Sequence, residues 1–302
     1  MPYNHVALIG LGLISSSIAL ALRRKNKHVI ITGTSRSPET RKKAADLGIC
    51  EVRDNSIETV KNADLIILCV PVGAMASVVQ EFAKTLKQGV TVTDVGSVKV
   101  EVIASIAPLL SKGIDFIPGH PLAGTENSGP EAGFASLFDN RWCLLTPSKN
   151  YCNPKAVQRL RSFWEGLGAR VDEMDAEYHD LVLAVTSHVP HLIAYTMVGV
   201  ADDLSSITKS EVINYSAAGF RDFTRIAASD PTMWRDVFLN NKEASLEILG
   251  RFTEELTALQ RAIRRGDGDL LFKYFSRTRE VRRKILEAGQ DINEPNFGRG
   301  KN

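Results

Sequence analysis

Short apolar segments alternate with amphipathic segments through the first 174 residues of the chain. The apolar segments are rich in β-branched residues and are bounded by Gly, Pro or Asp, which is typical of strands. The segments between them have the spacing of amphipathic helices. Strands that are apolar almost throughout and alternate with helices indicate a parallel sheet covered on both faces. The predicted strands are 5–9, 29–33, 65–70, 90–94, 114–118, 142–146 and 169–173, and the predicted helices include 14–25, 39–47, 73–86 and 153–167.

The pattern changes after about residue 176, where strand signals end and long helical periodicities fill the chain. The predicted helices are 179–202, 233–265 and 270–288, and we expect the polar tail 293–302 to be frayed. Their apolar positions form wider faces than one small bundle would bury, which favours a homodimer through this region. We therefore predict two domains, 1–174 and 175–302.

Composition narrows the class of protein. A chain of 302 residues with 44% apolar and 24% charged residues is typical of a globular protein with two domains. A net charge of +2 gives no reason to expect nucleic-acid or membrane binding, and no uninterrupted apolar run reaches the length of a membrane span. Because the N-terminus leads directly into a predicted strand, we expect no signal peptide. Four widely spaced cysteines indicate reduced thiols, so we expect a cytoplasmic protein.

A glycine-rich turn follows the first predicted strand and opens the first predicted helix. Gly10 permits the tight turn, and Gly12 lets backbone amides approach a pyrophosphate at the helix N-terminus. Ser15 replaces the third glycine of the usual fingerprint, where a small residue suffices for close helix–strand contact. In this context a dinucleotide-binding turn is favoured over a turn without a ligand. The predicted fold is a Rossmann-type dinucleotide-binding α/β domain followed by an all-α dimerisation and substrate domain. The expected cofactor-binding residues are Gly10, Gly12, Leu13, Ile14, Ser35, Arg36, Val70 and Pro71.

The end of the second predicted strand distinguishes between two cofactors. NAD-binding sites usually carry an acidic residue there, which accepts a hydrogen bond from the ribose 2′-hydroxyl. Residues 33–37 contain no acid, and Ser35 and Arg36 would instead bind a 2′-phosphate. We predict a preference for NADP, with NAD possible. The alternative is that Arg36 is a solvated loop charge.

Candidate chemistry lies in a predicted loop at residues 119–129, which Gly and Pro interrupt. Such a loop packs poorly as core and presents polar side chains well, so His120 is a candidate proton acceptor near pH 7. The alternative is a structural histidine. Ser97 follows another strand on the expected cofactor edge, where its hydroxyl could act in the site or cap a helix at 98–110.

Three further motifs follow in the helical half: SHVPH at 187–191, GFRDFTR at 219–225 and SDPTMWRD at 229–236. Together with HPLAGTE at 120–126, this ordered set resembles the prephenate/arogenate (cyclohexadienyl) dehydrogenases of tyrosine biosynthesis, from about residue 5 to about residue 285. The departures are Ser15 and the missing acid near Ser35. The resemblance implies NAD(P)-dependent oxidative decarboxylation of prephenate and/or arogenate to 4-hydroxyphenylpyruvate and/or tyrosine.

The resemblance also implies roles for individual residues. His120 would accept the proton of the substrate 4-hydroxyl, Ser97 would bridge His120, that hydroxyl and the nicotinamide, and Arg225 would bind the ring carboxylate. The remaining pocket residues that it implies are Thr125, Glu126, His191 and Trp234, with Asp222 orienting Arg225 or contacting the substrate.

Non-functional alternatives remain for four of these residues. Glu126 could be a solvated loop charge, Asp222 and Arg225 an ordinary surface pair, and Trp234 core packing.

Three other functions fit the sequence less well. His188 and His191 share a helical face, but no HExxH motif or carboxylate arrangement accompanies them, so no metal is expected. A β-hydroxyacid or 6-phosphogluconate-type dehydrogenase normally relies on a lysine in the first helix of the second domain, and residues 177–200 contain none. A non-catalytic dinucleotide sensor of the same fold would not need His120, Ser97 and Arg225 together.

Overall fold

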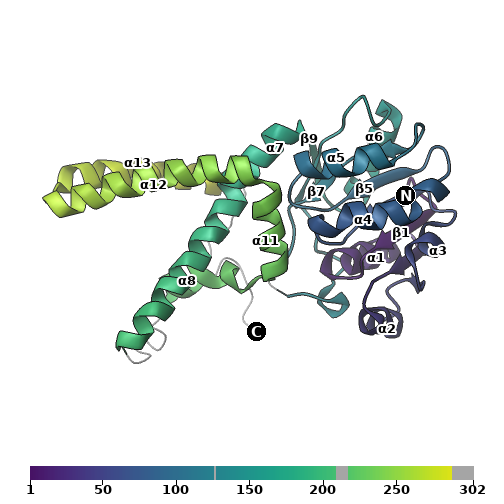
Figure 1. Cartoon of the computed structure of the whole chain (residues 1–302), viewed down its shortest axis with the longest axis horizontal. Coiled ribbons are helices and arrows are strands. Elements are labelled where there is room, and N and C mark those ends of the chain that lie inside the picture. The colour runs from purple at the N-terminus through teal and green to yellow at the C-terminus, as the bar shows by residue number, and fades with distance from the viewer. Residues whose placement is uncertain (126, 209–216, 288–302) are drawn as a thin grey trace. The chain divides into compact units, whose positions relative to one another are not determined.

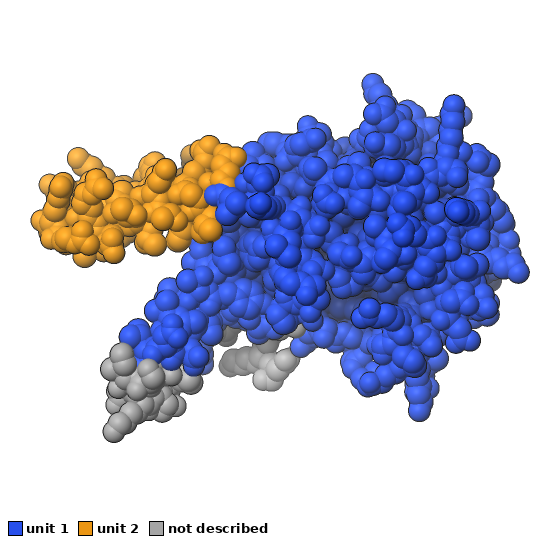
Figure 2. Space-filling model, in the orientation of Figure 1, with its two compact units in different colours: residues 1–246 blue, residues 247–302 orange. Residues whose placement is uncertain are grey.

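The computed structural model describes residues 1–125, 127–208 and 217–287. The chain forms two compact units, Met1–Leu246 and Glu247–Asn302, which Figure 2 colours separately. The first unit holds a parallel sheet with its covering helices and also the helices that follow as far as Leu246. The predicted class, an α/β domain followed by a helical region, is confirmed.

The main sheet has six parallel strands in the order β3-β2-β1-β4-β5-β6. The strand order reverses between β1 and β4, and ligands bind outside the carboxyl ends of strands at such a point in open α/β sheets. The turns that follow β1, β4 and β5 therefore meet at one edge. The strands are β1 His5–Ile9, β2 Ile30–Thr34, β3 Glu51–Val52, β4 Leu65–Leu68, β5 Thr91–Asp94 and β6 Asp115–Phe116.

Helices cover both faces of this sheet, because side chains along each strand alternate between the faces. On β1, Val6 and Leu8 join the core cluster that contains α1 and α6, whereas Ala7 and Ile9 join the cluster that contains α4, α5 and α11. Figure 1 shows α4 and α5 side by side. The helices of this part are α1 Leu13–Lys25, α2 Pro38–Asp46, α3 Ser56–Val60, α4 Val72–Phe82, α5 Val100–Ile106 and α6 Pro154–Gly166.

A second, three-stranded sheet contains His120. Strand β7 (Gly119–Pro121) pairs antiparallel with β8 (Trp142–Leu145), and β8 pairs parallel with β9 (Arg170–Glu173). The prediction that His120 lies in a loop is therefore wrong: it pairs with Leu144 inside β7. Pro121 is compatible with this placement because β7 is an edge strand, where a missing N–H does not break the ladder.

The helical region begins with α7 (Ala176–Leu183), one π-helical turn (Ala184–His188) and α8 (Val189–Thr208). The predicted helix 233–265 is interrupted at Asn241, whose side chain is hydrogen-bonded elsewhere. The expected tail 293–302 lies outside the described residues. The later helices are α10 Ala218–Thr224, α11 Pro231–Asn240, α12 Lys242–Arg265 and α13 Gly268–Glu287.

One helical stretch, Ala176–Leu204, is long and apolar enough to cross a membrane by length and composition alone. Polar residues divide the stretch, so it contains no uninterrupted apolar run of that length. Three of those residues, His179, Asp180 and His188, are buried and hydrogen-bonded within the first unit. The part of this stretch that holds these three residues is therefore packed within that unit, whereas Met197, Val198 and Val200 of α8 are exposed.

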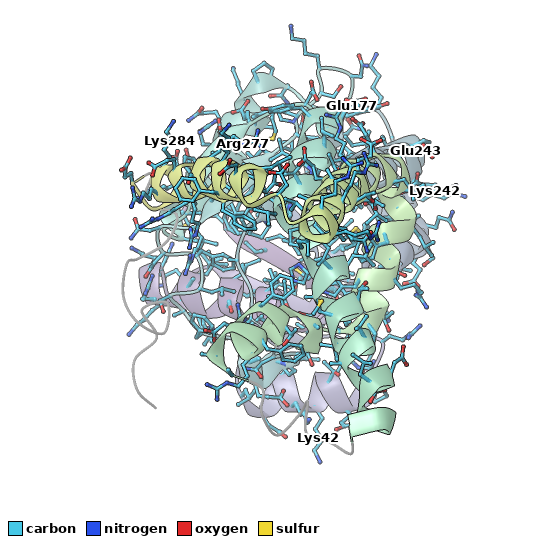
Figure 3. All side chains as sticks on the ribbon, turned by 90° about the vertical axis from the view of Figure 1, so that its left-hand side faces the viewer. Lys42, Glu177, Lys242, Glu243, Arg277 and Lys284 are labelled. Carbon is cyan, nitrogen blue, oxygen red and sulfur yellow. The ribbon has the colours of Figure 1, made fainter. Side chains whose placement is uncertain are left out.

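In its described residues, the second unit consists of α12 from Glu247 onward and the whole of α13. Gly266 connects the two helices with φ +67°, a conformation that favours glycine. Charged side chains such as Arg277 and Lys284 extend from α13 (Figure 3). Large apolar side chains of the same unit are exposed as well, among them Phe272 at 73% and Ile263 at 67%.

Candidate active site

The glycine-rich turn between β1 and α1 has the shape of a dinucleotide cradle. Gly10 has φ +101°, and a Cβ atom there would lie 2.6 Å from the carbonyl oxygen of Cys69. A Cβ atom at Gly12 would meet nothing within 4 Å, so open space lies beside the helix N-terminus. Gly10 thus forms the tight turn, and Gly12 leaves room for a phosphate. This arrangement fits the dinucleotide that the sequence predicts.

Ser15, the residue in place of the third glycine, is fully buried. Its hydroxyl accepts a hydrogen bond from the Gly12 amide at 2.8 Å and donates to the Gly12 carbonyl at 3.1 Å. The serine thereby stabilises the first turn of α1. Leu13 and Ile14 form the start of that helix, directly after the open space at Gly12.

The neighbouring strand contributes two more of the predicted cofactor residues. Val70 follows β4, and its Cγ1 atom lies 3.0 Å from the position that a Cβ atom of Gly10 would take. Pro71 is the N-cap of α4. The structure thus brings the ends of β1 and β4 together at the edge that the fold predicts for a cofactor.

The turn after β2 carries the two residues predicted to select the cofactor. Ser35 is half-buried and Arg36 is exposed. Arg41 of α2 holds this turn, because its guanidinium donates to the Ser35 carbonyl at 2.6 Å and to the Arg36 carbonyl at 3.4 Å. Sequence reasoning missed Arg41, although a basic residue one turn into the following helix is placed to support such a turn.

A buried ion pair ties β7 to the end of β5. Lys99 and Asp94 are fully buried and directly hydrogen-bonded, and the Lys99 ammonium also donates to the Gly119 carbonyl at 2.7 Å. The Asp94 carboxylate accepts from the amides of Gly96 and Gly119, at 2.8 and 3.2 Å. Both backbone polar groups of Gly119 are therefore held, and this fixes the backbone directly before His120.

The imidazole of His120 is the first member of a chain of buried groups. Its Nδ1 atom lies 2.9 Å from Nε2 of His179, and Nδ1 of His179 lies 2.8 Å from Oδ1 of Asp180. The Asp180 carboxylate also accepts from the amides of Lys99 and Val100, at 2.8 and 3.0 Å. Residues of α7 thus support a histidine that is presented by β7.

The same carboxylate explains a difference from the sequence prediction at Ser97. The helix after β5 begins at Val100 rather than at residue 98, and Asp180, not Ser97, binds its first amides. The alternative that Ser97 caps this helix is therefore wrong. Ser97 is half-buried, and none of the described residues is hydrogen-bonded to its hydroxyl.

His188 is a second buried histidine beside this chain of groups. The Asn241 amide donates to its Nδ1 atom at 3.0 Å and to the Asp180 carbonyl at 2.8 Å. Burial lowers the pKa of His188 to about 4, although Asp180 and the backbone of Ser97 act in the opposite direction. His188 therefore stays neutral at pH 7 and links α11, α7 and the Ser97 turn.

The predicted substrate residues of the helical region form a group of their own. The ring of His191 stacks on Trp234, with centroids 3.7 Å apart, and its Nδ1 atom binds the Ser187 carbonyl at 2.7 Å. Burial lowers the pKa of His191, and the nearby charge of Arg225 lowers it further. Trp234 is buried and Arg225 is half-buried, directly after α10.

The other predicted pocket residues are less enclosed. Thr125 is exposed, and its hydroxyl accepts from the Asn127 amide at 3.2 Å. Asp222 is exposed on α10, one turn before Arg225. Glu126 lies outside the described residues.

The surroundings of His120 keep its imidazole neutral at pH 7. Burial lowers its pKa well below the usual value of 6.5, and the nearby charge of Lys99 acts in the same direction. Burial lowers the pKa of His179 as well, against its hydrogen bond to Asp180. A neutral imidazole can accept a proton, so the arrangement suits general-base chemistry at His120.

Sequence reasoning did not assign the supporting groups Lys99, His179, Asp180 and Asn241. The adjacent His179 and Asp180 were a signal, because two polar residues within an otherwise apolar helix face require partners when they are buried.

Comparison with known proteins agrees with this fold. Residues 18–173 match the family model of the prephenate dehydrogenase nucleotide-binding domain, and residues 175–277 match that of the prephenate dehydrogenase dimerization domain. The chain is 42% identical over 291 residues to the cyclohexadienyl dehydrogenase of Zymomonas mobilis, which covers 96% of this chain and 98% of that protein. It is 35% identical over 284 residues to the prephenate dehydrogenase of Bacillus subtilis, covering 92% of this chain and 75% of that protein.

Solved structures give the same result. The prephenate dehydrogenase from Aquifex aeolicus, in complex with hydroxyphenyl propionate and NAD+, superposes with a TM-score of 0.86 at 35% identity and covers 93% of this chain and 98% of that one. Synechocystis arogenate dehydrogenase superposes with a TM-score of 0.76 at 28% identity, covering 93% and 99%. The family named by the sequence motifs is therefore confirmed, and this chain belongs to the prephenate dehydrogenase family.

Proposed function

We propose that this protein catalyses the NAD(P)-dependent oxidative decarboxylation of prephenate and/or arogenate to 4-hydroxyphenylpyruvate and/or tyrosine. One observation carries the proposal: a buried, neutral His120, with Nδ1 held by His179, lies beside the edge of the sheet where the dinucleotide turn ends. Gly119 links the two places, because a Cβ atom there would lie 3.1 Å from the carbonyl oxygen at the end of β5.

The residues divide the chemistry as follows. The substrate loses a hydride from C4 and gives the proton of its 4-hydroxyl to His120, which leaves a ketone at C4. Loss of CO2 from this ketone makes the ring an aromatic phenolate, which takes the proton back and becomes the phenol of the product. A bound nicotinamide dinucleotide supplies the acceptor for the hydride. His120 takes the hydroxyl proton at Nε2, a contribution of about 10²–10⁴-fold for a general base. Ser97, on the turn after β5, orients the same hydroxyl.

Cationic and aromatic groups of the helical region would hold the rest of the substrate. The Arg225 guanidinium suits the ring carboxylate, because its planar fork can donate two hydrogen bonds to one carboxylate. His191 and Trp234 form a stacked wall beside Arg225, on the side of the substrate side chain. Thr125 and Asp222 complete the proposed pocket. Glu126 is also predicted to line it, but lies outside the described residues.

Within the proposed cofactor site, we assign the preference to NADP. The support is the turn after β2, where residues 34–37 carry no carboxylate and Arg41 fixes the backbone of Ser35 and Arg36. A carboxylate would repel a 2′-phosphate, whereas Arg36 would bind it. Replacing Arg36 by Ala should lower kcat/KM for NADP while sparing NAD, and an unchanged ratio of the two would contradict the assignment.

The proposal extends to assembly and to location. We propose a homodimer through domain 175–302, with 1–174 as the cofactor domain, in the cytoplasm. The support for a dimer is that large apolar side chains of α12 and α13, such as Ile263 and Phe272, are exposed in a single chain. The dimerization-domain family model matches most of the same region.

The activity is tested by mixing the purified protein with NADP or NAD and either prephenate or arogenate. The expected result is reduced cofactor with release of an equal amount of CO2. Parallel kinetics with the two substrates would identify the preferred one. No turnover of either substrate with either cofactor would contradict the proposed function.

A further inference from the structure

The hydrogen-bonded series from Asp180 through His179 to His120 defines which nitrogen of His120 is free. We infer that His179 and Asp180 are positioning residues that hold His120 as the Nδ1–H tautomer, with the lone pair on Nε2. The inference rests on the proposed function, in which Nε2 receives the substrate proton. Neither residue needs to touch the substrate for this role.

The series starts at the carboxylate. Asp180 accepts two backbone amides at the N-terminus of α5, so its oxygens act as acceptors. Oδ1 also lies 2.8 Å from Nδ1 of His179. That nitrogen must carry the hydrogen, because an ionised carboxylate has none to donate. In a neutral His179 the other nitrogen, Nε2, then carries a lone pair.

The same reasoning applies to the imidazole of His120. Nε2 of His179 lies 2.9 Å from Nδ1 of His120, and a lone pair on the first requires a hydrogen on the second. His120 therefore presents Nε2 with its lone pair, and none of the described residues is hydrogen-bonded to that atom. The opposite tautomer would place two lone pairs face to face in a buried site, which disfavours it roughly tenfold to hundredfold.

The arrangement also serves the protonated state of His120. When Nε2 takes the substrate proton, the imidazolium keeps its Nδ1–H bond to His179. The positive charge is then stabilised through His179 by the carboxylate of Asp180. Asp180 is held in turn by the start of α5, and its backbone carbonyl accepts a hydrogen bond from Asn241. Rigid support of this kind keeps a base in its productive orientation.

The direct test is the tautomer of His120, read from the ¹⁵N shifts of the protein labelled at its six histidines and assigned with His120→Asn. The wild type should show a protonated Nδ1 and an unprotonated Nε2 at neutral pH. A wild-type His120 with the hydrogen on Nε2 would overturn the inference. This readout needs no turnover, so it is separate from a failure of the proposed activity.

Two variants test the consequence for the reaction. His179→Gln keeps an amide oxygen that can accept from Nδ1 of His120, whereas His179→Met has a similar length and no such acceptor. We expect kcat to fall about tenfold to hundredfold in the Met variant, with KM little changed and the tautomer preference lost. The Gln variant should keep the tautomer and most of the kcat.

The outcomes are distinct. Equal loss of kcat in the Gln and Met variants, both folded by circular dichroism, would overturn the inference, and so would a Met variant with wild-type kcat. His188→Gln is a matched control, because His188 is buried beside Asp180 and its Nδ1 atom is hydrogen-bonded to Asn241 rather than to His120. It should leave the tautomer of His120 as it is in the wild type. If the Met variant does not fold, the wild-type spectrum and the Gln variant still decide the matter.

Discussion

The ammonium group of Lys99 donates a hydrogen bond to the carbonyl oxygen of Gly119 at 2.7 Å, so the residue directly before α5 holds the strand that carries His120. The same ammonium pairs with the buried carboxylate of Asp94, which binds the Gly119 amide. One ion pair therefore connects the cofactor edge of the sheet with the proposed base.

Removal of this lysine should cost much stability. Lys99→Met leaves Asp94 buried without its cation, and breaking a buried pair in this way typically costs about 3–5 kcal/mol. The measurement is the free energy of unfolding in urea. Lys42→Met is the control, because Lys42 is exposed (Figure 3) and its replacement should change the value by no more than about 0.5 kcal/mol. Similar values for the two variants would show that the buried pair does not hold this part of the fold.

The two glycines of the dinucleotide turn should respond differently to alanine. Gly10→Ala places a Cβ atom 2.6 Å from a backbone oxygen at φ +101°, so we expect a lower melting temperature together with weaker cofactor binding. Gly12→Ala meets no protein atom within 4 Å and should fold normally. Its methyl group would occupy the space expected for the pyrophosphate, so KM for the cofactor should rise. Normal cofactor binding by a folded Gly12→Ala protein would argue against a phosphate at this place.

Arg225→Ala should weaken substrate binding selectively. Loss of a charged hydrogen-bond partner for the ring carboxylate should raise KM for the substrate about 10- to 100-fold. Affinity for the cofactor should not change, because Arg225 belongs to the helical region. Arg170→Ala, at an exposed arginine of β9, provides the control and should leave both constants near wild type. An Arg225 variant with a normal substrate KM would remove the carboxylate role.

The pH dependence follows from the buried state of His120. A general base acts when it is unprotonated, and burial lowers the pKa of His120 well below 6.5, with the charge of Lys99 acting in the same direction. Activity should therefore be retained as pH falls through 6.5 and should be lost only at more acid pH. The test is kcat/KM for the substrate as a function of pH. An acid limb centred at the ordinary histidine value of 6.5 would show that His120 is not held in this environment.

Much of the fold could be predicted because local patterns determine it. The strand at His5–Ile9 and the helix at Leu13–Lys25 follow from an apolar run and a glycine turn that are continuous in sequence. The break at Asn241 could not be predicted in this way, because its reason is a hydrogen bond to the distant Asp180. The strand around His120 was missed because Gly119 and Pro121 are typical of loops, and only pairing with β8 makes them a strand.

The same limit applies to the site. Motifs single out His120 and Arg225, whose residue types already suggest their chemistry. For the supporting groups, the sequence can indicate that the adjacent His179 and Asp180 need partners but not which partners they have. Lys99 binds the Gly119 carbonyl 20 residues away, and Asp180 binds the Lys99 amide 81 residues away. Such contacts arise from the fold, so they appear only when the elements are packed together.

The most direct test of the account is the steady-state reaction of His120→Asn with NADP and the preferred substrate, compared with wild type. Asparagine keeps a polar side chain of moderate size but cannot accept the hydroxyl proton at neutral pH. The account predicts that kcat falls about 10²–10⁴-fold while KM for the substrate changes little. A His120→Asn protein that turns over prephenate or arogenate near the wild-type rate would contradict it.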